Sequence, residues 1–267
     1  MKSRGLRLLA LSFLPLPLLV LSAFANSVSL GTAGSFAVLA GSTVTNTGSS
    51  VLHGNVGVWG SGTAVTGFPP GIVTAPGTIY AGGAVPQGAQ SDLTTAYNVA
   101  AGLTPTSTLT GLDLGGRTLT PGVYFFAGPA QLTGTLTLDT LGNPNAQFVF
   151  QIGSTLTTAS NSSVIFKNSV TDSNVFWQVG SSATLGTTTS FQGNILALTS
   201  ITLTTGAAIG CGSALARNGA VTLDSNVIGG GCGGSSSRST VPEPGTLGLL
   251  GTGLAILAGA ARRKLRI

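Results

Sequence analysis

Short runs in which aliphatic residues alternate one by one with threonine or another polar residue recur through most of the chain. Examples are residues 135–139 (Thr-Leu-Thr-Leu-Asp), 201–204 (Ile-Thr-Leu-Thr) and 221–224 (Val-Thr-Leu-Asp). Because side chains of a strand point alternately to its two faces, this pattern predicts short β-strands with aliphatics on one face and hydroxyls on the other. Glycine, asparagine, serine and proline separate the runs, and charged residues make up only 6% of the chain. The sequence therefore indicates an all-β domain of closely stacked strands.

A longer phrase within this pattern occurs twice. Residues 147–154 (Gln-Phe-Val-Phe-Gln-Ile-Gly-Ser) are echoed by residues 174–181 (Asn-Val-Phe-Trp-Gln-Val-Gly-Ser), so that Gln178 takes the place of Gln151 in the second copy. The step from Gln151 to Gln178 suits one turn of a three-sided β-solenoid, in which strands stack coil upon coil. A β-sandwich with a coincidental internal similarity is the alternative fold.

One segment, residues 84–103, interrupts the β pattern. Ser91 is placed to act as the N-cap of a helix. The apolar residues that follow it at helical spacing are Ala96, Val99, Ala100 and Leu103. The segment is therefore predicted to form an α-helix that lies along the solenoid with its apolar face buried, in a structural role.

The formal net charge of +5 and the isoelectric point near 9.8 come from the two ends of the chain. Seven of the 11 basic residues lie within residues 1–7 and 262–266. The body between them carries four basic residues against six acidic ones. Because the body has no basic stripe to neutralise phosphates, we expect no binding to nucleic acid.

The N-terminus has the three-part pattern of a secretory signal peptide. Basic residues are followed by an apolar run over residues 8–21 and by the small-x-small site Ala23-Phe24-Ala25. We therefore expect residues 1–25 to be removed and the mature chain to begin at Asn26. The alternative is a membrane-spanning anchor, which the short, proline-interrupted run disfavours.

The C-terminus carries a second targeting signal. A Gly/Ser-rich linker over residues 231–240 is followed by Val241-Pro242-Glu243-Pro244, an apolar stretch and a basic cluster, together residues 241–267. This order resembles the PEP-CTERM sorting signal of Gram-negative bacteria. The resemblance implies passage through the export machinery and processing by an exosortase. It also implies a final place outside the cell or on its outer surface, with transient membrane anchoring through the C-terminal segment. An ordinary C-terminal membrane anchor is the alternative.

Chemically active side chains are scarce. Two cysteines, Cys211 and Cys232, and one histidine, His53, cannot fill the usual four-ligand zinc site, so we expect no metal. Export places the cysteines in an oxidising compartment, and we predict that they form one disulfide; two free buried thiols are the alternative. The single histidine lies in a turn-like phrase and the carboxylates are scattered, so we expect neither catalytic residues nor a cofactor.

Six phrases, taken in order, resemble the microbial ice-binding protein family. They are residues 30–48 (LGTAGSFAVLAGSTVTNTG), 54–57 with 66–69 (GNVG, TGFP), 92–97 (DLTTAY), 114–124 (LGGRTLTPGVY), 176–180 (FWQVG) and 193–197 (GNILA). The resemblance covers nearly all of residues 26–230. It implies a discontinuous, right-handed parallel β-solenoid of triangular cross-section with a lateral α-helix. It also implies binding to ice or ordered water through one flat side, and we expect a monomer.

A flat solenoid side of this composition presents a regular array of methyl and hydroxyl groups. The candidates for it are outward residues next to inward aliphatics: Thr66, Thr155, Thr157, Thr184, Thr202, Thr204, Thr222 and Asp224. Two functions fit such a surface, an exported ice-binding protein and a structural matrix or adhesion protein associated with exopolysaccharide. For any single threonine the alternative is an ordinary solvated strand residue. The side of the coil that each candidate occupies is not readable from the sequence.

Overall fold

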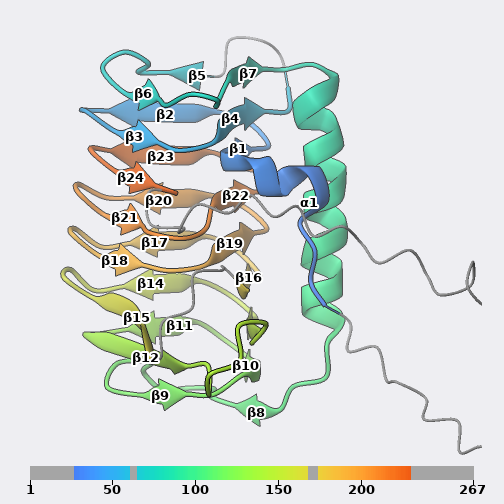
Figure 1. Cartoon of the computed structure of the whole chain (residues 1–267), viewed down its shortest axis with the longest axis vertical. Helices are drawn as coiled ribbons and strands as arrows, with labels where there is room; N and C mark the ends of the chain where they lie inside the picture. The colour runs from blue at the N-terminus through green and yellow to red at the C-terminus, as the bar shows by residue number, and fades with distance from the viewer. Residues whose placement is uncertain (1–26, 61–64, 168–173, 230–267) are drawn as a thin grey trace, which may run out of the picture.

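The computed structural model describes residues 27–60, 65–167 and 174–229, which form a three-sided β-solenoid with one α-helix along its side (Figure 1). The strands of each sheet run parallel. The predicted all-β solenoid with a lateral helix is therefore confirmed. The predicted signal peptide, the linker, Cys232 and the sorting motif lie outside the described residues.

Each complete coil contributes one strand to each of three sheets, called A, B and C. Sheet A consists, in spatial order, of β7 (Ile79–Ala81), β4 (Asn55–Val58), β1 (Phe36–Ala40), β22 (Ala214–Ala216), β19 (Asn194–Ala197), β16 (Val175–Val179), β13 (Phe148–Ile152), β10 (Gly122–Phe126) and β8 (Ser107–Thr108). Sheet B consists of β11 (Ala130–Leu132), β14 (Leu156–Thr158), β17 (Ala183–Leu185), β20 (Ile201–Leu203), β23 (Val221–Asp224), β2 (Val44–Thr47) and β5 (Val65–Thr66). Sheet C consists of β6 (Ile72–Val73), β3 (Val51–Leu52), β24 (Val227–Ile228), β21 (Ala208–Ile209), β18 (Ser190–Phe191), β15 (Ser163–Lys167), β12 (Thr135–Asp139) and β9 (Thr118–Leu119).

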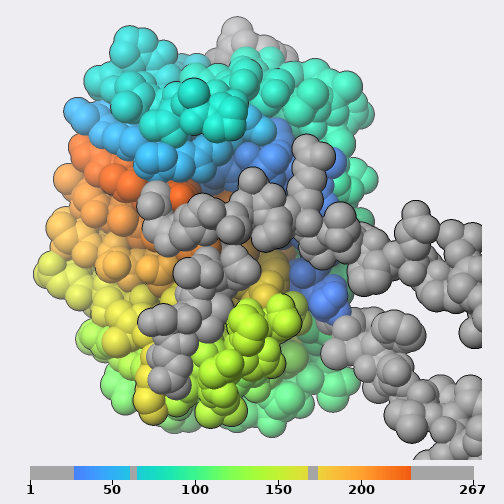
Figure 2. Space-filling model, viewed as in Figure 1, coloured from blue at the N-terminus to red at the C-terminus, as the bar shows by residue number. Residues whose placement is uncertain are grey.

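The coils do not stack in the order of the sequence. The first coil, β1 to β3, pairs with the last coil, β22 to β24, so that Val38 lies opposite Ala214 and Val51 opposite Val227. Figure 2 shows this contact as a blue band against an orange-red band. The helix α1 (Ala84–Gly102) carries the chain from β7, at one end of sheet A, to β8 at the other (Figure 1). The remaining coils then build back toward the first, which is the discontinuity that the family resemblance implies.

The helix α1 begins earlier than its predicted cap. Its N-cap is Gly83, and Ser91 lies within the helix, so the prediction of Ser91 as N-cap is wrong. Pro86 is tolerated near the start because the first amides of a helix have no intrahelical partner. Of the predicted apolar face, Ala96 and Ala100 are fully buried. At the other end the side-chain amide of Gln151 donates hydrogen bonds to the carbonyls of Ala100 and Leu103, both at 2.8 Å, and so caps the helix.

The interior of the solenoid is filled by the inward residues of all three sheets. Within it an aromatic stack runs from coil to coil through Tyr124, Phe150 and Trp177, with the rings of Phe150 and Trp177 3.8 Å apart and nearly parallel. Phe191, on sheet C of the same coil as Trp177, packs against the Trp177 ring at a tilt. Gln151 lies opposite Gln178 on adjacent strands, so the step between the two copies of the repeated phrase is one turn of the coil, as predicted.

A second core lies on the other side of sheet A. There α1 and a short 3-10 helix, η1 (Gly31–Ser35), cover outward residues of the sheet such as Leu39 and Leu196. Asp92 of α1 holds η1 in place, because its carboxylate accepts hydrogen bonds from the amide and the hydroxyl of Thr32 at 2.7 and 2.6 Å. The outer face of sheet A is thus occupied by protein, and the outer faces of sheets B and C are not covered by any described helix.

The edge between sheets B and C is made by residues in the left-handed backbone conformation. One occurs in every turn from sheet B to sheet C: Gly134, Asn161, Thr188, Gly206, Ser225, Gly48 and Gly67, in spatial order. Gly67 (φ +81°) is the most confined, because a Cβ there would lie 1.9 Å from the carbonyl oxygen of Asn46. At Gly206 (φ +71°) the nearest atom to an added Cβ is 3.5 Å away, on Thr188.

Substitution of Gly206 and of Gly67 allows the cost of backbone strain to be measured separately from the cost of steric overlap. We expect Gly206→Ala to lower the free energy of unfolding by about 1 kcal/mol, the usual cost of a left-handed alanine. Gly67→Ala adds the displacement of the Asn46 carbonyl, for a further ~1–3 kcal/mol. Denaturant unfolding of both variants measures this, and an equal loss at the two positions would contradict the role given to the close contact.

Candidate functional site

The outer face of sheet B carries a continuous column of threonines. Strand register places Thr157, Thr184, Thr202, Thr222, Thr45 and Thr66 at the same position of six successive strands, from β14 to β5. Parallel strands lie ~4.8 Å apart, so the column repeats at that spacing. Gln131 of β11 continues the column at one end, opposite Thr157. We call these six threonines the central column.

Mostly short side chains flank the central column on both sides. Two positions before it lie Thr155, Ser182, Ser200, Ala220 and Thr43, whose strands are joined by backbone hydrogen bonds of 2.9 to 3.1 Å. Two positions after it lie Ala159, Gly186, Thr204, Asp224, Thr47 and Phe68, with Asp224 paired to Thr47 and Phe68 packed against the core. Residues on the same face of one strand repeat at roughly 6.6 Å, so the face is a two-dimensional lattice of short side chains.

All eight residues predicted for the functional surface lie on this one face. Thr66, Thr157, Thr184, Thr202 and Thr222 belong to the central column. Thr155 lies before it, and Thr204 and Asp224 lie after it. The sequence reasoning missed Thr45, although residues 44–47 (Val-Thr-Asn-Thr) show the same alternation that selected the others. The structure therefore brings the candidates together; their role in binding stays a prediction.

The face is rigid because the residues between the threonines are anchored inside the solenoid. Leu156, Ala183, Ile201 and Val221, the inward neighbours on four consecutive strands, are each at most 1% exposed. Threonine itself is branched at Cβ, which restricts the rotation of its side chain on a strand. The positions of the methyl and hydroxyl groups are thus set by the backbone ladder before any ligand arrives.

The hydroxyls of the central column are free to bind solvent or a ligand. In the part of the chain that the structure describes, none of the six makes a hydrogen bond to protein. Neighbouring threonines differ: Thr204 donates to the carbonyl of Leu185 at 2.8 Å, and Thr47 to that of Leu223 at 3.3 Å. The middle of the face therefore offers unused hydroxyls, and its border is tied to the backbone.

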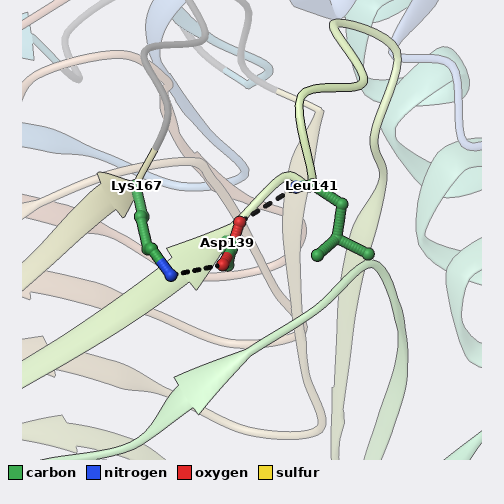
Figure 3. A network of polar contacts seen from close by, with 3 residues as sticks. All are labelled: Asp139, Leu141 and Lys167. Atoms are coloured by element: carbon green, nitrogen blue, oxygen red, sulfur yellow. Dashed lines mark hydrogen bonds and ion pairs between the residues drawn. The ribbon is translucent and has the colours of Figure 1, made fainter.

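Charge is almost absent from the face. Asp224 is the one ionisable residue among the positions described above, and its carboxylate accepts a hydrogen bond of 2.5 Å from the hydroxyl of Thr205 at the border. The ion pair between Lys167 and Asp139, 2.9 Å long, lies on sheet C, where Asp139 also accepts the amide of Leu141 (Figure 3). Long, strongly hydrated side chains are therefore kept off the lattice of sheet B.

Other chemistry is sparse in the described residues. His53 is exposed, with Nδ1 3.0 Å from the hydroxyl of Thr74 on sheet C. Among residues 27–60, 65–167 and 174–229, no three His, Cys, Asp or Glu side chains gather as metal ligands, and no helix has the length and apolar character to cross a membrane. Cys211 is disulfide-bonded. Its predicted partner, Cys232, lies outside the described residues, so that pairing stays a prediction.

Comparison with known proteins gives two family matches. A model described as "Ice-binding-like" matches residues 38–229, and one described as "PEP-CTERM protein-sorting motif" matches residues 240–264. The chain is 60% identical to the "Ice-binding protein" of Nostoc sp. (strain HG1), across 91% of this chain and 90% of the relative.

Solved structures agree with these matches. The crystal structure of an ice-binding protein from the Antarctic ascomycete Antarctomyces psychrotrophicus superposes with a TM-score of 0.72 at 39% identity, covering 78% of this chain and all of that one. An ice-binding protein from an Antarctic biological consortium superposes with a TM-score of 0.71 at 45% identity, covering 81% and 95% of the two chains.

The difference between free and bonded hydroxyls leads to a stability prediction. Thr202→Val removes a hydroxyl without a protein partner, so we expect the free energy of unfolding to change by under ~0.5 kcal/mol. Thr204→Val removes the hydrogen bond to Leu185 and should cost about 1 kcal/mol. Urea unfolding of the two variants provides the measurement; a Thr202 variant that loses as much as the Thr204 variant would show that the central hydroxyls have partners in the protein.

Proposed function

The chain belongs to the ice-binding-like family, and on this premise we propose that it is an exported protein that adsorbs to ice through the outer face of sheet B. The observation that carries the choice of face is the central column, with six threonines in register whose hydroxyls make no hydrogen bond to any described residue. The family consists of ice-binding proteins, and we propose no catalytic role for this member.

The lattice of sheet B has the properties that adsorption to a crystal requires. Its methyl groups order neighbouring water into cages, and its hydroxyls hold that water by hydrogen bonds. Because the strands are already fixed by their ladders, little conformational entropy is lost on binding. Ice that grows between adsorbed molecules bulges outward, and a curved ice surface melts at a lower temperature than a flat one. Growth and recrystallisation therefore slow at the bound surface.

The alternative function, a matrix or adhesion protein on the same scaffold, is not favoured by the comparisons. The relatives that match over most of the chain are named for ice binding. We retain a monomer as the active unit, because one copy of sheet B already presents the whole column. Association with exopolysaccharide after export remains compatible with this function and is not needed for it.

The sorting motif supports an activity outside the cell or on its surface. Its match at residues 240–264 implies processing by an exosortase, and the ice-binding relatives agree with an exported protein. We propose that residues 1–25 are removed as a signal peptide and that residues 26–230 form the exported domain. Transient anchoring through residues 241–267 belongs to the same proposal.

A bulky ring within the lattice should abolish ice activity without unfolding the solenoid. We expect Thr157→Tyr and Thr202→Tyr each to remove most ice recrystallisation inhibition, because the rigid strands cannot withdraw a protruding ring from the flat contact. The melting temperature should stay nearly unchanged, since both side chains point out of the core, Thr157 exposed and Thr202 half-buried, and surface substitutions usually cost under ~0.5 kcal/mol.

Thr118→Tyr on β9 is the matched control, because Thr118 is an exposed threonine of sheet C. It should leave ice activity intact. If both sheet B variants keep full activity in a parent that shows it, sheet B is not the ice-binding face.

Processing at the two ends has its own measurement. We expect the intact mass of protein from its native host to lack residues 1–25 and to correspond to cleavage near Val241. The reason is the order of signals at each end, which matches a secretory leader and a sorting motif. A soluble cytosolic species that still begins at Met1 would contradict the export pathway.

A further inference from the structure

In a three-sided coil, the edge between sheets C and A lies opposite the outer face of sheet B. The chain runs from a strand of sheet A to one of sheet B, then to one of sheet C, and turns at the C/A edge into the next coil. Gly229, the last described residue, follows β24 of sheet C and therefore lies at this edge. The described chain thus ends on the side away from the threonine lattice.

Stacking fixes this exit point from both neighbouring coils. The amide of Gly229 donates to the carbonyl of Ile209 at 2.9 Å, in the coil on one side. In the coil on the other side, the carbonyl of His53 is so close that a Cβ on Gly229 would lie 2.6 Å from its oxygen. Because β24 is an inner strand of sheet C, with β3 and β21 as neighbours, the exit lies on the flank of the stack and not at its end.

The N-terminal exit lies on the same side of the molecule. Val28 is 6% exposed and packs in the core between α1 and sheet A. From there η1 leads directly into β1, with Thr32 held by Asp92 of the helix. Within the described residues, neither end of the chain lies on the outer face of sheet B.

We propose that the C/A edge is the attachment side of the protein and that, while the chain is anchored by its C-terminal segment, the threonine lattice points away from the cell and adsorbs to ice. This inference rests on the proposed function. Only the short segment 230–239 separates Gly229 from the start of the sorting-motif match at residue 240. The apolar stretch that anchors the chain begins at Leu247, so residues 230–246 form the tether, with a full extension of at most roughly 61 Å. An attached solenoid therefore stays near the membrane, and its orientation decides whether ice can reach sheet B. The anchored form therefore binds ice, as a released form does.

The orientation is tested by attaching the full chain to beads at chosen points. Biotin is placed on an acceptor peptide after Ile267, on an unnatural side chain at Asn98 of α1, or on the same side chain at Thr202 of sheet B. Streptavidin beads carrying each form are exposed to a cooled ice surface, and the retained fraction is measured beside the adsorption of the free protein. Asn98 is exposed on the helix that covers sheet A and serves as the matched control for internal attachment.

We expect beads attached through the C-terminus or Asn98 to be retained on ice, and beads attached through Thr202 to be retained at least tenfold less. If the free protein adsorbs but C-terminally attached beads do not, the orientation inference is wrong and the proposed function stands. Equal retention of the Thr202 beads would show that sheet B is not the contact, which overturns both. If the free protein itself does not adsorb, the proposed function fails.

Discussion

The parallel backbone ladder between successive coils is the interaction on which the rest of the molecule depends. It sets the register that places Thr184 opposite Thr202, and in doing so it aligns the inward residues beside them, Ala183 and Ile201. A slip of one residue would turn every threonine of a strand into the core and every aliphatic residue toward water. The buried aliphatics therefore guarantee the position of the outer hydroxyls, and core packing and surface function share one constraint.

Aromatic stacking and helix docking reinforce this ladder from its two sides. Inside the solenoid, Phe150 and Trp177 stack at 3.8 Å on consecutive strands of sheet A. Outside, α1 packs against the other face of the same sheet, and Arg217 lies over the ring of Tyr97 at 4.6 Å. Sheet A is thereby buried on both faces. It acts as the structural wall of the molecule and leaves sheet B free for the ligand.

Strand alternation predicted the class of fold and eight residues of the lattice, but it missed others such as Thr45 and did not give their arrangement. The number of residues in one turn of the coil is not constant. Gln151 pairs with Gln178, and Gln178 pairs in turn with Leu196, which is clearly closer to it along the chain than Gln151 is. Turns of different length absorb the difference, so counting along the chain cannot assign a strand to a side. Ser91 was a misleading cap signal because the helix begins earlier, at Ala84. Packing against sheet A stabilises this first part of the helix, which the spacing of apolar residues did not indicate.

The order of the coils has a consequence for how the chain acquires its structure. Val38 in the first coil pairs with Ala214 in the last, so the first coil gains this neighbour only when almost the whole domain has been made. Contacts of such long range slow folding, because the intervening chain must be brought together before the pairing is rewarded. In a chain that emerges N-terminus first, the solenoid therefore stays incomplete until residue 228 has emerged. The interface between the first and last coils is therefore the part of the solenoid that forms last in a chain made from its N-terminus.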